Sequence, residues 1–469
     1  MITRRCFCQA LALSPLPTLA SSVETISADI VIVGSGGAGL CTACAAIQAG
    51  AKNIFLAEKS PTVGGHTILS AGTVAAVWPK LQKPQGIDDS WELMASQMIA
   101  IGKTNDPSLV RVLCQNSGAS LQWMEDLGVR WRKDVRKIFG CPNVRGFKTN
   151  NARSGFDYII AALNFIKKNN VNIFTNTELT SIELSPSGTV GGAIFTIDGN
   201  KTMRVKTKKL ILATGGFTAN RELLTNFAPD VTSEMRSSAN PKGLLYDGCD
   251  GQAMIEASLC GARLLNLDAV QIIPMGGGRT ELENGVDIWL NSHGERFVKE
   301  GCPWKELKAA IDRQGESRLW VLSAPHGSET ENIESKLLDG SLKIANSWDE
   351  LASILQLPKE KIRQTVSEYN DSVLGKISGL IDVAESARPL SGPPFYIGPV
   401  NLTVHTTLGG IAINTRSEVV KSNGEPIPGL YAAGEVTGGL HGQDKMAGTG
   451  MTENFVFGRI AGTNAANSI

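Results

Sequence analysis

One short segment near the start of the chain restricts its fold more than any other feature. The apolar run 29–33 (DIVIV) leads directly into GSGGAG at 34–39, and residues 40–49 have the composition of a helix. A second apolar strand, 53–57, ends at Glu58. A strand, a glycine-rich turn, a helix and a second strand that ends in an acid are typical of a nucleotide-binding βαβ unit. The sequence therefore predicts a parallel sheet that binds a dinucleotide.

Each glycine of that turn has a physical task. Gly34 makes the tight turn, Gly36 lets backbone N–H groups approach a pyrophosphate, and Gly39 permits close packing of the helix on the strand. The N-terminus of the helix attracts the phosphate charge, and the Glu58 carboxylate can accept hydrogen bonds from ribose hydroxyls. These residues are therefore predicted to hold the cofactor.

Further glycine-rich segments occur at both ends of the chain. VGGHT at 63–67 is suited to contact with a flavin ring, and the apolar strand 209–213 precedes Thr214 and Gly215. Near the C-terminus, GLYAAGE at 429–435 predicts a strand and a turn, and AGTGM at 447–451 opens a final helix. Strand–glycine segments at both ends indicate one nucleotide-binding domain interrupted by an insertion. The predicted fold class is α/β, with a Rossmann-like nucleotide-binding domain that contains an inserted second domain.

Composition excludes several classes of protein. The chain of 469 residues has 45 basic and 45 acidic side chains, so no basic field indicates a nucleic-acid partner. It contains no apolar run long enough for a transmembrane helix. The nine cysteines are scattered, and the single C-x-x-C, Cys41 with Cys44, is followed by Ala45, which excludes a covalent c-type haem. We expect Cys41 and Cys44 to pack as small residues on a helix.

The first twenty residues resemble an export signal. Arg4 and Arg5 precede an apolar stretch at 10–19, which ends in small residues up to Ala20. Twin arginines, a short apolar region and a small-residue cleavage site are typical of twin-arginine signal peptides. We therefore expect residues 1–20 to be a signal peptide and the protein to be periplasmic.

The chain resembles the fumarate reductase/succinate dehydrogenase flavoprotein superfamily, in the branch of soluble flavocytochrome fumarate reductases and urocanate reductases. The resemblance covers nearly the whole chain from residue 28, and its motifs lie at 34–39, 58–59, 64–66, 212–216, 250–251, 294–298, 404–410, 433–439 and 457–459. It implies an α/β fold in which a Rossmann-like FAD-binding domain at 28–265 and 405–469 carries an inserted α+β capping domain at 266–404. It also implies reduction of a C=C bond by hydride transfer from flavin N5.

The resemblance also implies which residues contact the FAD. They are Gly34, Gly36, Ala38, Gly39, Glu58, Lys59, Gly65, His66, Thr67, Ala71, Gly72, Thr214, Gly215, Asp250, Thr406, Glu435, Gly450 and Met451. A His-Thr pair stands at 66–67, where relatives with covalent flavin bond the 8α carbon. Soluble reductases carry Asn at that place. Both covalent attachment through His66 and an ordinary hydrogen bond are therefore open.

The substrate side departs from the family. Fumarate reductases hold two carboxylates with two arginines and two histidines, and one of the arginines is also the general acid. Of these four positions the chain keeps His405, and it carries Ile273, Trp304 and Lys445 at the others. Replacing an arginine with tryptophan removes both a bidentate carboxylate partner and a proton source. Fumarate is therefore not the expected substrate.

These replacements favour an α,β-unsaturated monocarboxylate with an aryl or alkyl body. Ile273 and Trp304 would form an apolar wall, Lys445 and His405 would bind one carboxylate, and Gly448 is expected beside the substrate. Trp304 as simple core of the capping domain is the alternative.

The general acid is not identified by the sequence. The candidates are Lys445 and His405, and with less support Lys305, which adjoins Trp304. Glu300 and a tyrosine of the capping domain compete for the role, and Glu281 or Glu283 could belong to a proton relay. An ammonium can serve as an acid if burial lowers its pKa.

Three functions follow from these observations. The first is an exported FAD-dependent reductase of anaerobic respiration that receives electrons from a separate c-type cytochrome or another donor protein. The second is a dehydrogenase or oxidase of a saturated substrate, ketosteroid-like or acyl-like. The third is a flavin-binding protein without catalysis, which the lost acid arginine motivates. The motifs and the export signal favour the first, and no metal is expected.

Overall fold

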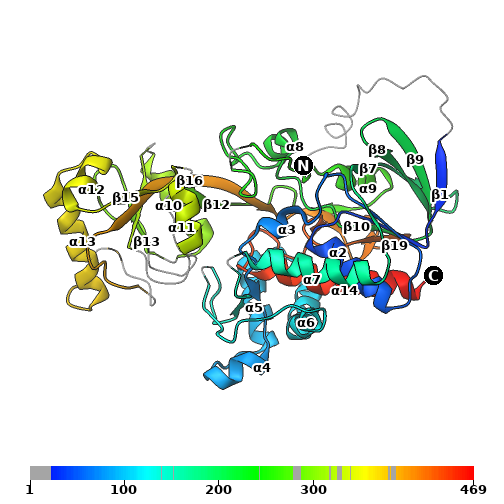
Figure 1. Ribbon diagram of the computed structural model, residues 1–469, viewed down its shortest axis with the longest axis horizontal. Coiled ribbons are helices and arrows are strands. Elements are labelled where there is room, and N and C mark those ends of the chain that lie inside the picture. The colour runs from blue at the N-terminus through cyan, green and yellow to red at the C-terminus, as the bar shows by residue number, and fades with distance from the viewer. Residues whose placement is uncertain are drawn as a thin grey trace.

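The structure is a computed structural model of the 469-residue chain, and it describes residues 23–138, 140–151, 153–241, 243–277, 287–300, 302–315, 318–324, 330–338, 340–378, 381 and 387–469. The expected signal peptide at 1–20 and the relay candidates Glu281 and Glu283 lie outside the described residues. The molecule is elongated, and a smaller part that carries α12 and α13 extends from a larger body (Figure 1).

The centre of the larger body is a six-stranded sheet. Its order is β18(Glu418–Val420), β19(Pro426–Ala432), β10(Leu210–Leu212), β2(Ile30–Val33), β3(Ile54–Ala57) and β6(Ile173–Phe174). All neighbouring pairs are parallel except β18 with β19. The strands β2, β3 and β10 are buried along their whole length, as expected of parallel strands that are covered on both faces.

Two long helices pack against each other beside this sheet. They are α2(Gly37–Gln48) and α14(Thr449–Asn467). The helix α2 begins within the glycine turn itself, three residues before the position that sequence analysis predicted, because the turn supplies its first residues. Cys41 and Cys44 are buried on α2, and burial raises the pKa of the Cys44 thiol to about 12, so both behave as packing residues.

Smaller elements complete the larger body. A four-stranded sheet contains β1(Glu24–Ser27), β9(Lys201–Lys206), β8(Val190–Ile197) and β7(Thr177–Leu184). Two small sheets are β11(Leu264–Leu265)–β17(Gly410–Ala412)–β20(Thr437–Gly438) and β4(Val74–Ala75)–β5(Gly146–Phe147). The remaining helices are α3(Gly65–Leu69), α4(Pro79–Gln82), η1(Lys83–Gln85), α5(Trp91–Gly102), α6(Pro107–Asp126), α7(Ser154–Lys168), α8(Arg221–Phe227) and α9(Gln252–Leu259).

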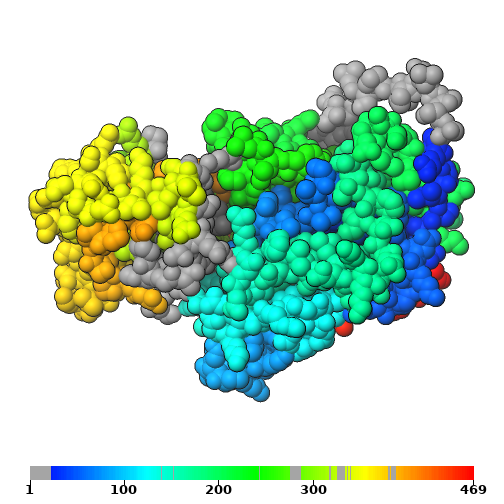
Figure 2. All heavy atoms as spheres, viewed as in Figure 1, coloured from blue at the N-terminus to red at the C-terminus, as the bar shows by residue number. Residues whose placement is uncertain are grey.

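The smaller part is built on a second, antiparallel sheet. Its strands are β12(Val270–Gly277), β16(Phe395–Thr407), β14(Trp320–Ser323), β13(Asp287–Leu290) and β15(Lys343–Ala345). Its helices are α10(Trp304–Gln314), α11(Thr330–Leu338), α12(Trp348–Leu355) and α13(Lys359–Val373). The long strand β16 runs from this part into the larger body (Figure 1), and the smaller part stands out from that body in the space-filling view (Figure 2).

The predicted α/β class is confirmed by this arrangement, and the smaller part has its own core. One buried cluster there includes Ile288, Tyr369 and Phe395, and another includes Ile273 and Trp304. The boundaries predicted for the two domains, 28–265 with 405–469 and 266–404, stay a prediction. Among the described helices, none combines the length and the apolar character that crossing a membrane requires.

Candidate functional site

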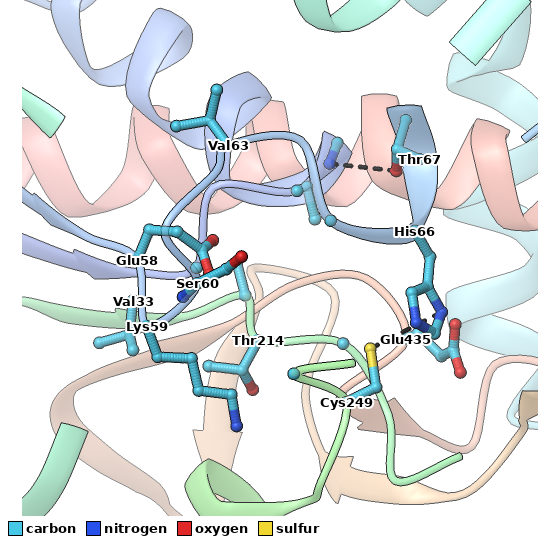
Figure 3. Close-up of a pocket in the computed structure, with 18 of the residues that line it drawn as sticks. Val33, Glu58, Lys59, Ser60, Val63, His66, Thr67, Thr214, Cys249 and Glu435 are labelled. Carbon is cyan, nitrogen blue, oxygen red and sulfur yellow. Dashed lines mark hydrogen bonds between the residues drawn. The ribbon is translucent and has the colours of Figure 1, made fainter. Parts of the chain in front are cut away.

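A cavity of about 350 Å³ opens where the parallel strands of the main sheet end (Figure 3). The residues that line it come from the glycine turn, the end of β3, helix α3, the 213–215 segment and the 433–435 turn. Ligands of open α/β sheets bind outside the carboxyl ends of the strands, which is where this cavity lies. The cavity therefore gathers segments from both ends of the chain at one site.

The Glu58 carboxylate is held at this cavity by three hydrogen bonds. One oxygen accepts from the Ser35 backbone N–H at 2.8 Å and from the Ser35 hydroxyl at 2.7 Å, and the other accepts from the Ser60 N–H at 2.8 Å. The neighbouring Lys59 ammonium lies 2.6 Å from Asp250. Ser35 and Ser60 were not identified from sequence, although both stand beside predicted residues. The carboxylate is oriented before any ribose binds.

The glycine turn has the geometry that a close phosphate approach requires. Gly34 has φ of +102°, and a Cβ atom there would lie 2.3 Å from the carbonyl oxygen of Ala213. A Cβ atom on Gly39 would lie 1.9 Å from the Gly34 oxygen, whereas one on Gly36 would meet nothing within 4 Å. The Gly37 N–H donates to Thr67 Oγ1 at 3.2 Å. The backbone at Gly36 is thus open to the cavity, while Gly34 and Gly39 are required by packing.

The other end of the cavity carries an ionisable cluster (Figure 3). His66 Nε2 lies 2.7 Å from Asp247 Oδ1, and Cys249 Sγ lies 3.7 Å from His66 Nδ1. Burial opposes a charge on His66, but Cys249 and the hydrogen bond to Asp247 more than offset it and raise the pKa of His66 well above its ordinary value. Both ring nitrogens therefore contact protein groups in this structure. Covalent attachment of flavin at His66 stays a prediction.

The same cluster has donor atoms suited to a metal ion. Nitrogen, carboxylate and thiol ligand atoms of His66, Asp247 and Cys249 lie within 4.8 Å of one another. Asp247 Oδ2 is buried without a hydrogen-bond partner. His66 and Cys249 also line the cavity in which the predicted cofactor contacts gather, so the cluster faces the cofactor's own space. Sequence reasoning missed Asp247 and Cys249, because they lie far from His66 in the chain.

The 433–435 turn lines the cavity with Ala433 and Glu435, and the end of strand β16 holds this turn from behind. Glu435 accepts hydrogen bonds from the Thr407 N–H at 3.1 Å and from the Thr407 hydroxyl at 3.4 Å. The neighbouring Thr406 is buried, and Gly450 and Met451 lie in the first turn of α14. Of the other predicted cofactor residues, Gly65, Thr214 and Gly215 line the cavity. The predicted residues that are not among its lining residues are Gly39, Ala71, Gly72, Thr406, Gly450 and Met451.

Trp304 lies where the smaller part meets the larger body. It is buried in one cluster with Ile273, and it also reaches the loop before β5. A methyl group on Gly140 would lie 3.0 Å from the indole nitrogen of Trp304 and 3.6 Å from the Cβ of Ala447. The tryptophan is therefore part of a core and, at its indole edge, a neighbour of the 445–448 segment.

Lys445 stands in the segment that leads into α14. Burial lowers the pKa of its ammonium, while Glu435, Glu453 and Asp444 oppose that shift. The Gln271 amide fixes this segment by donating to Asp444 Oδ1 at 3.1 Å and to the Lys445 carbonyl at 3.2 Å. Gly448 follows at the N-terminal cap of α14.

The other candidates for the general acid lie in different settings. His405 Nδ1 lies 2.9 Å from the Ser238 hydroxyl. Lys305 is exposed on α10, so the structure does not bring it to the buried face of Trp304. Glu300 is buried within the smaller part. Its two carboxylate oxygens accept hydrogen bonds from Arg296, from Nε at 2.9 Å and from Nη2 at 2.7 Å. The structure thus brings Trp304 and the 445–448 segment together and leaves Lys305 outside.

These features define a class of protein. A parallel sheet with a glycine turn at the first strand, an oriented acid after the second strand and an inserted second sheet is typical of flavin-dependent oxidoreductases. Residues 29–451 match the FAD binding domain family, and the chain belongs to that family. The residues present fit the cofactor, because the open backbone at Gly36 and the oriented Glu58 carboxylate supply what a dinucleotide needs.

Known relatives reduce C=C bonds. The chain is 33% identical to "Fumarate reductase (cytochrome)" of Shewanella frigidimarina, over 93% of this chain and 77% of that protein. It is 32% identical to "Urocanate reductase" of Eggerthella lenta, over 94% and 75%, and 28% identical to "Acrylate reductase flavoprotein subunit" of Shewanella woodyi, over 92% and 90%. The resemblance inferred from sequence is confirmed, and the chain is an FAD-dependent oxidoreductase that acts on C=C bonds.

A solved structure has the same fold. The open conformation of a flavocytochrome c3 fumarate reductase is 28% identical, with a TM-score of 0.76, and the match covers 100% of this chain and 81% of that one. The similarity therefore extends over the main sheet and the inserted part together.

Proposed function

We propose that the protein reduces the C=C bond of an α,β-unsaturated monocarboxylate with an aryl or alkyl body. The observation that carries the proposal is that the buried Trp304 and Ala447, which is in the segment that holds Lys445, both lie beside Gly140. An apolar wall beside a single cation suits one carboxylate and an apolar body, because a second carboxylate against that wall would be buried without a partner. A relative named as an acrylate reductase supports the same substrate class.

The residues of the chain have distinct tasks in this reaction. FAD, when bound, supplies the hydride that adds to the β-carbon. Lys445 binds the carboxylate, and this charge favours the enolate-like state that forms when the hydride arrives. Trp304 and Ile273 exclude water from the side of the substrate body. The lowered pKa of Lys445 makes its Nζ the strongest candidate for delivering a proton to the α-carbon.

A screen of substrates tests this function. The purified protein with FAD is reduced by dithionite-reduced viologen, and enoates are added while reoxidation is measured. We expect aryl- or alkyl-substituted acrylates to reoxidise it faster than fumarate. If no enoate causes reoxidation, the reductase proposal is wrong. Reduction of the flavin by a saturated compound would instead support a dehydrogenase or oxidase, and the lack of any reaction would support a non-catalytic flavin protein.

We further propose that the protein is exported by the twin-arginine route and receives electrons from a separate c-type cytochrome. The motif at Arg4 and Arg5 supports export, and the cytochrome-type fumarate reductase among the relatives supports such a donor. Mass spectrometry of the mature N-terminus would test export, since cleavage after Ala20 is expected. Flavin fluorescence that stays with the denatured band on a gel would show covalent attachment at His66, and a band without fluorescence would exclude it.

A further inference from the structure

Three large apolar residues stand exposed in succession before helix α9. Leu244 is 81% exposed, Leu245 is 58% exposed and Tyr246 is 61% exposed. Single exposed apolar residues are common on protein surfaces, but contiguous ones mark places that a ligand or partner covers. We therefore expect a ligand or a partner to cover this run.

The run lies at the edge of the cofactor cavity. Leu245 and Tyr246 line that cavity, whereas Leu244 is not among its lining residues. A methyl group on Gly248 would lie 2.9 Å from Lys59 Cε and 3.6 Å from a ring carbon of Tyr246. Tyr246 is thus a close neighbour of the residue that follows the ribose-binding acid.

The charged groups that act on Tyr246 also place its ring near Glu58. Burial, with Glu178, Asp250 and Glu58, raises the pKa of its phenol, and Lys59 opposes that shift. Tyr246 is therefore a neutral aromatic ring near Glu58 at neutral pH. Leu179 on β7 lines the same end of the cavity.

We propose that Leu245 and Tyr246 cap the adenine of bound FAD. The proposal rests on FAD binding in this cavity. A base attached to a ribose that Glu58 holds must lie close to Glu58, and Tyr246 and Leu245 supply the apolar surface there. Stacking of a base on an aromatic side chain covers one face of the base and the ring below it from water, and it requires no particular hydrogen bond. A stacked adenine would cover the exposed side chains of these two residues.

Binding by the apoprotein tests this cap. The FAD-free protein is titrated with FAD, ADP and FMN, and the dissociation constants are measured by fluorescence or calorimetry. We expect Tyr246→Ala to weaken FAD and ADP by about tenfold, which is the low end of the effect of losing one stacking partner. FMN, which has no adenosine, should bind the variant and the natural protein equally. Tyr246→Phe should keep the natural affinity for all three.

Leu244→Ala is the matched control, since Leu244 is in the same loop and even more exposed but does not line the cavity. This variant should bind FAD, ADP and FMN with the same affinities as the natural protein. The cap is wrong if Tyr246→Ala leaves FAD and ADP unchanged, if it weakens FMN to the same extent, or if Leu244→Ala has the same effect. Failure of the natural apoprotein to bind FAD would overturn both the cap and the proposed function, whereas failure of the enoate screen alone leaves the cap supported by binding.

Discussion

The Glu58 carboxylate shows how single residues prepare the cavity for its cofactor. Its three hydrogen bonds come from the glycine turn and from the end of β3, so the same backbone that makes the turn also orients the acid. Only 8% of the residue is exposed, which places its remaining acceptor capacity towards the cavity. A buried anion that is bound in this way costs little to reorganise when a ribose arrives.

Glu58→Gln tests this orientation. The amide loses the charge and puts a donor against the Ser35 or Ser60 N–H groups, so the ribose loses a charge-assisted partner. We expect FAD to bind about 10- to 100-fold more weakly, in line with hydrogen bonds to charged groups. Equilibrium titration of the apoprotein measures this effect. Glu183→Gln, which changes a surface acid on β7, is the control. Equal affinity of Glu58→Gln and the natural protein for FAD would contradict the assignment of Glu58 as the acid that holds the ribose.

Lys445→Met should weaken substrate binding and at the same time stabilise the fold. Loss of the cation should raise the Michaelis constant for an anionic substrate by about 10- to 100-fold, the effect of losing a charge-assisted hydrogen bond. The kcat should fall as well, because the variant lacks the proposed proton donor. FAD content should stay unchanged. The same variant should melt about 2 °C higher at neutral pH, because the natural ammonium is penalised by burial. Lys305→Met, an exposed change on α10, should alter neither property.

The pH dependence of this stability difference follows from the pKa of Lys445. The folded state lowers that pKa below the ordinary value of 10.5. Between the lowered value and 10.5 the unfolded chain binds more protons, so the natural protein gains stability as the pH rises. The melting difference between Lys445→Met and the natural protein should therefore be largest near neutral pH and narrow towards 10.5. A constant difference across that range would show that the lysine is not buried as a cation.

At the scale of elements, the close packing of α2 and α14 joins the two ends of the chain. Gly458 and Gly462 on α14 face α2, where a Cβ atom on Gly462 would lie 2.2 Å from the carbonyl oxygen of Thr42. Backbone atoms cannot move away as a flexible side chain can. The helix that opens with the predicted cofactor residues Gly450 and Met451 therefore depends on two glycines that carry no chemistry.

Gly462→Ala should separate these helices. The added methyl group must displace the backbone of α2, and we expect a loss of about 2 to 4 kcal/mol in the free energy of unfolding, as for other strongly overpacked sites. Urea denaturation measures the loss. Thr463→Ala, a change at the adjacent and partly exposed position of the same helix, should stay within about 0.5 kcal/mol of the natural protein. If Gly462→Ala left the free energy of unfolding unchanged, the two helices would have to lie further apart than they do in this structure.

At the scale of the whole molecule, Trp304 connects the smaller part to the larger body. It belongs to the core of the smaller part, yet its indole edge lies next to Gly140 and Ala447 of the body. A side chain at this junction can form a wall of the substrate site only if the two parts stay close. In the proposed function, the junction is therefore where substrate choice and the arrangement of the parts are coupled.

Trp304→Arg with Lys445→Arg should shift the enzyme towards fumarate. Two guanidinium groups could bind two carboxylates, while the arginine at 304 would fill the volume of the aryl group with an unpaired charge. We expect the ratio of kcat/KM for fumarate to that for an aryl acrylate to rise at least about tenfold. Trp304→Phe, which keeps an apolar ring, should retain the preference for the aryl acrylate. An unchanged ratio in the double variant would mean that neither residue contacts the substrate.

Local sequence patterns were sufficient for the nucleotide-binding part of the fold. The run 29–33, the glycine turn and the acid at 58 are neighbours in the chain, so their spacing alone predicts the strand, turn and helix that the structure contains. The α/β class and the FAD were predicted from these segments and from the family motifs.

Only the tertiary structure decided which distant side chains meet. His66 and Asp247 are 181 residues apart in the chain but 2.7 Å apart in space, and Trp304 meets Gly140 across the junction of the two parts. No spacing rule predicts such contacts, because they depend on how the whole chain closes its loops around two cores rather than on the period of a helix or strand. For the same reason the sequence could only name Trp304 as a wall of the site and Lys305 as a weaker candidate for the acid, whereas folding buried the tryptophan and left the lysine exposed on α10.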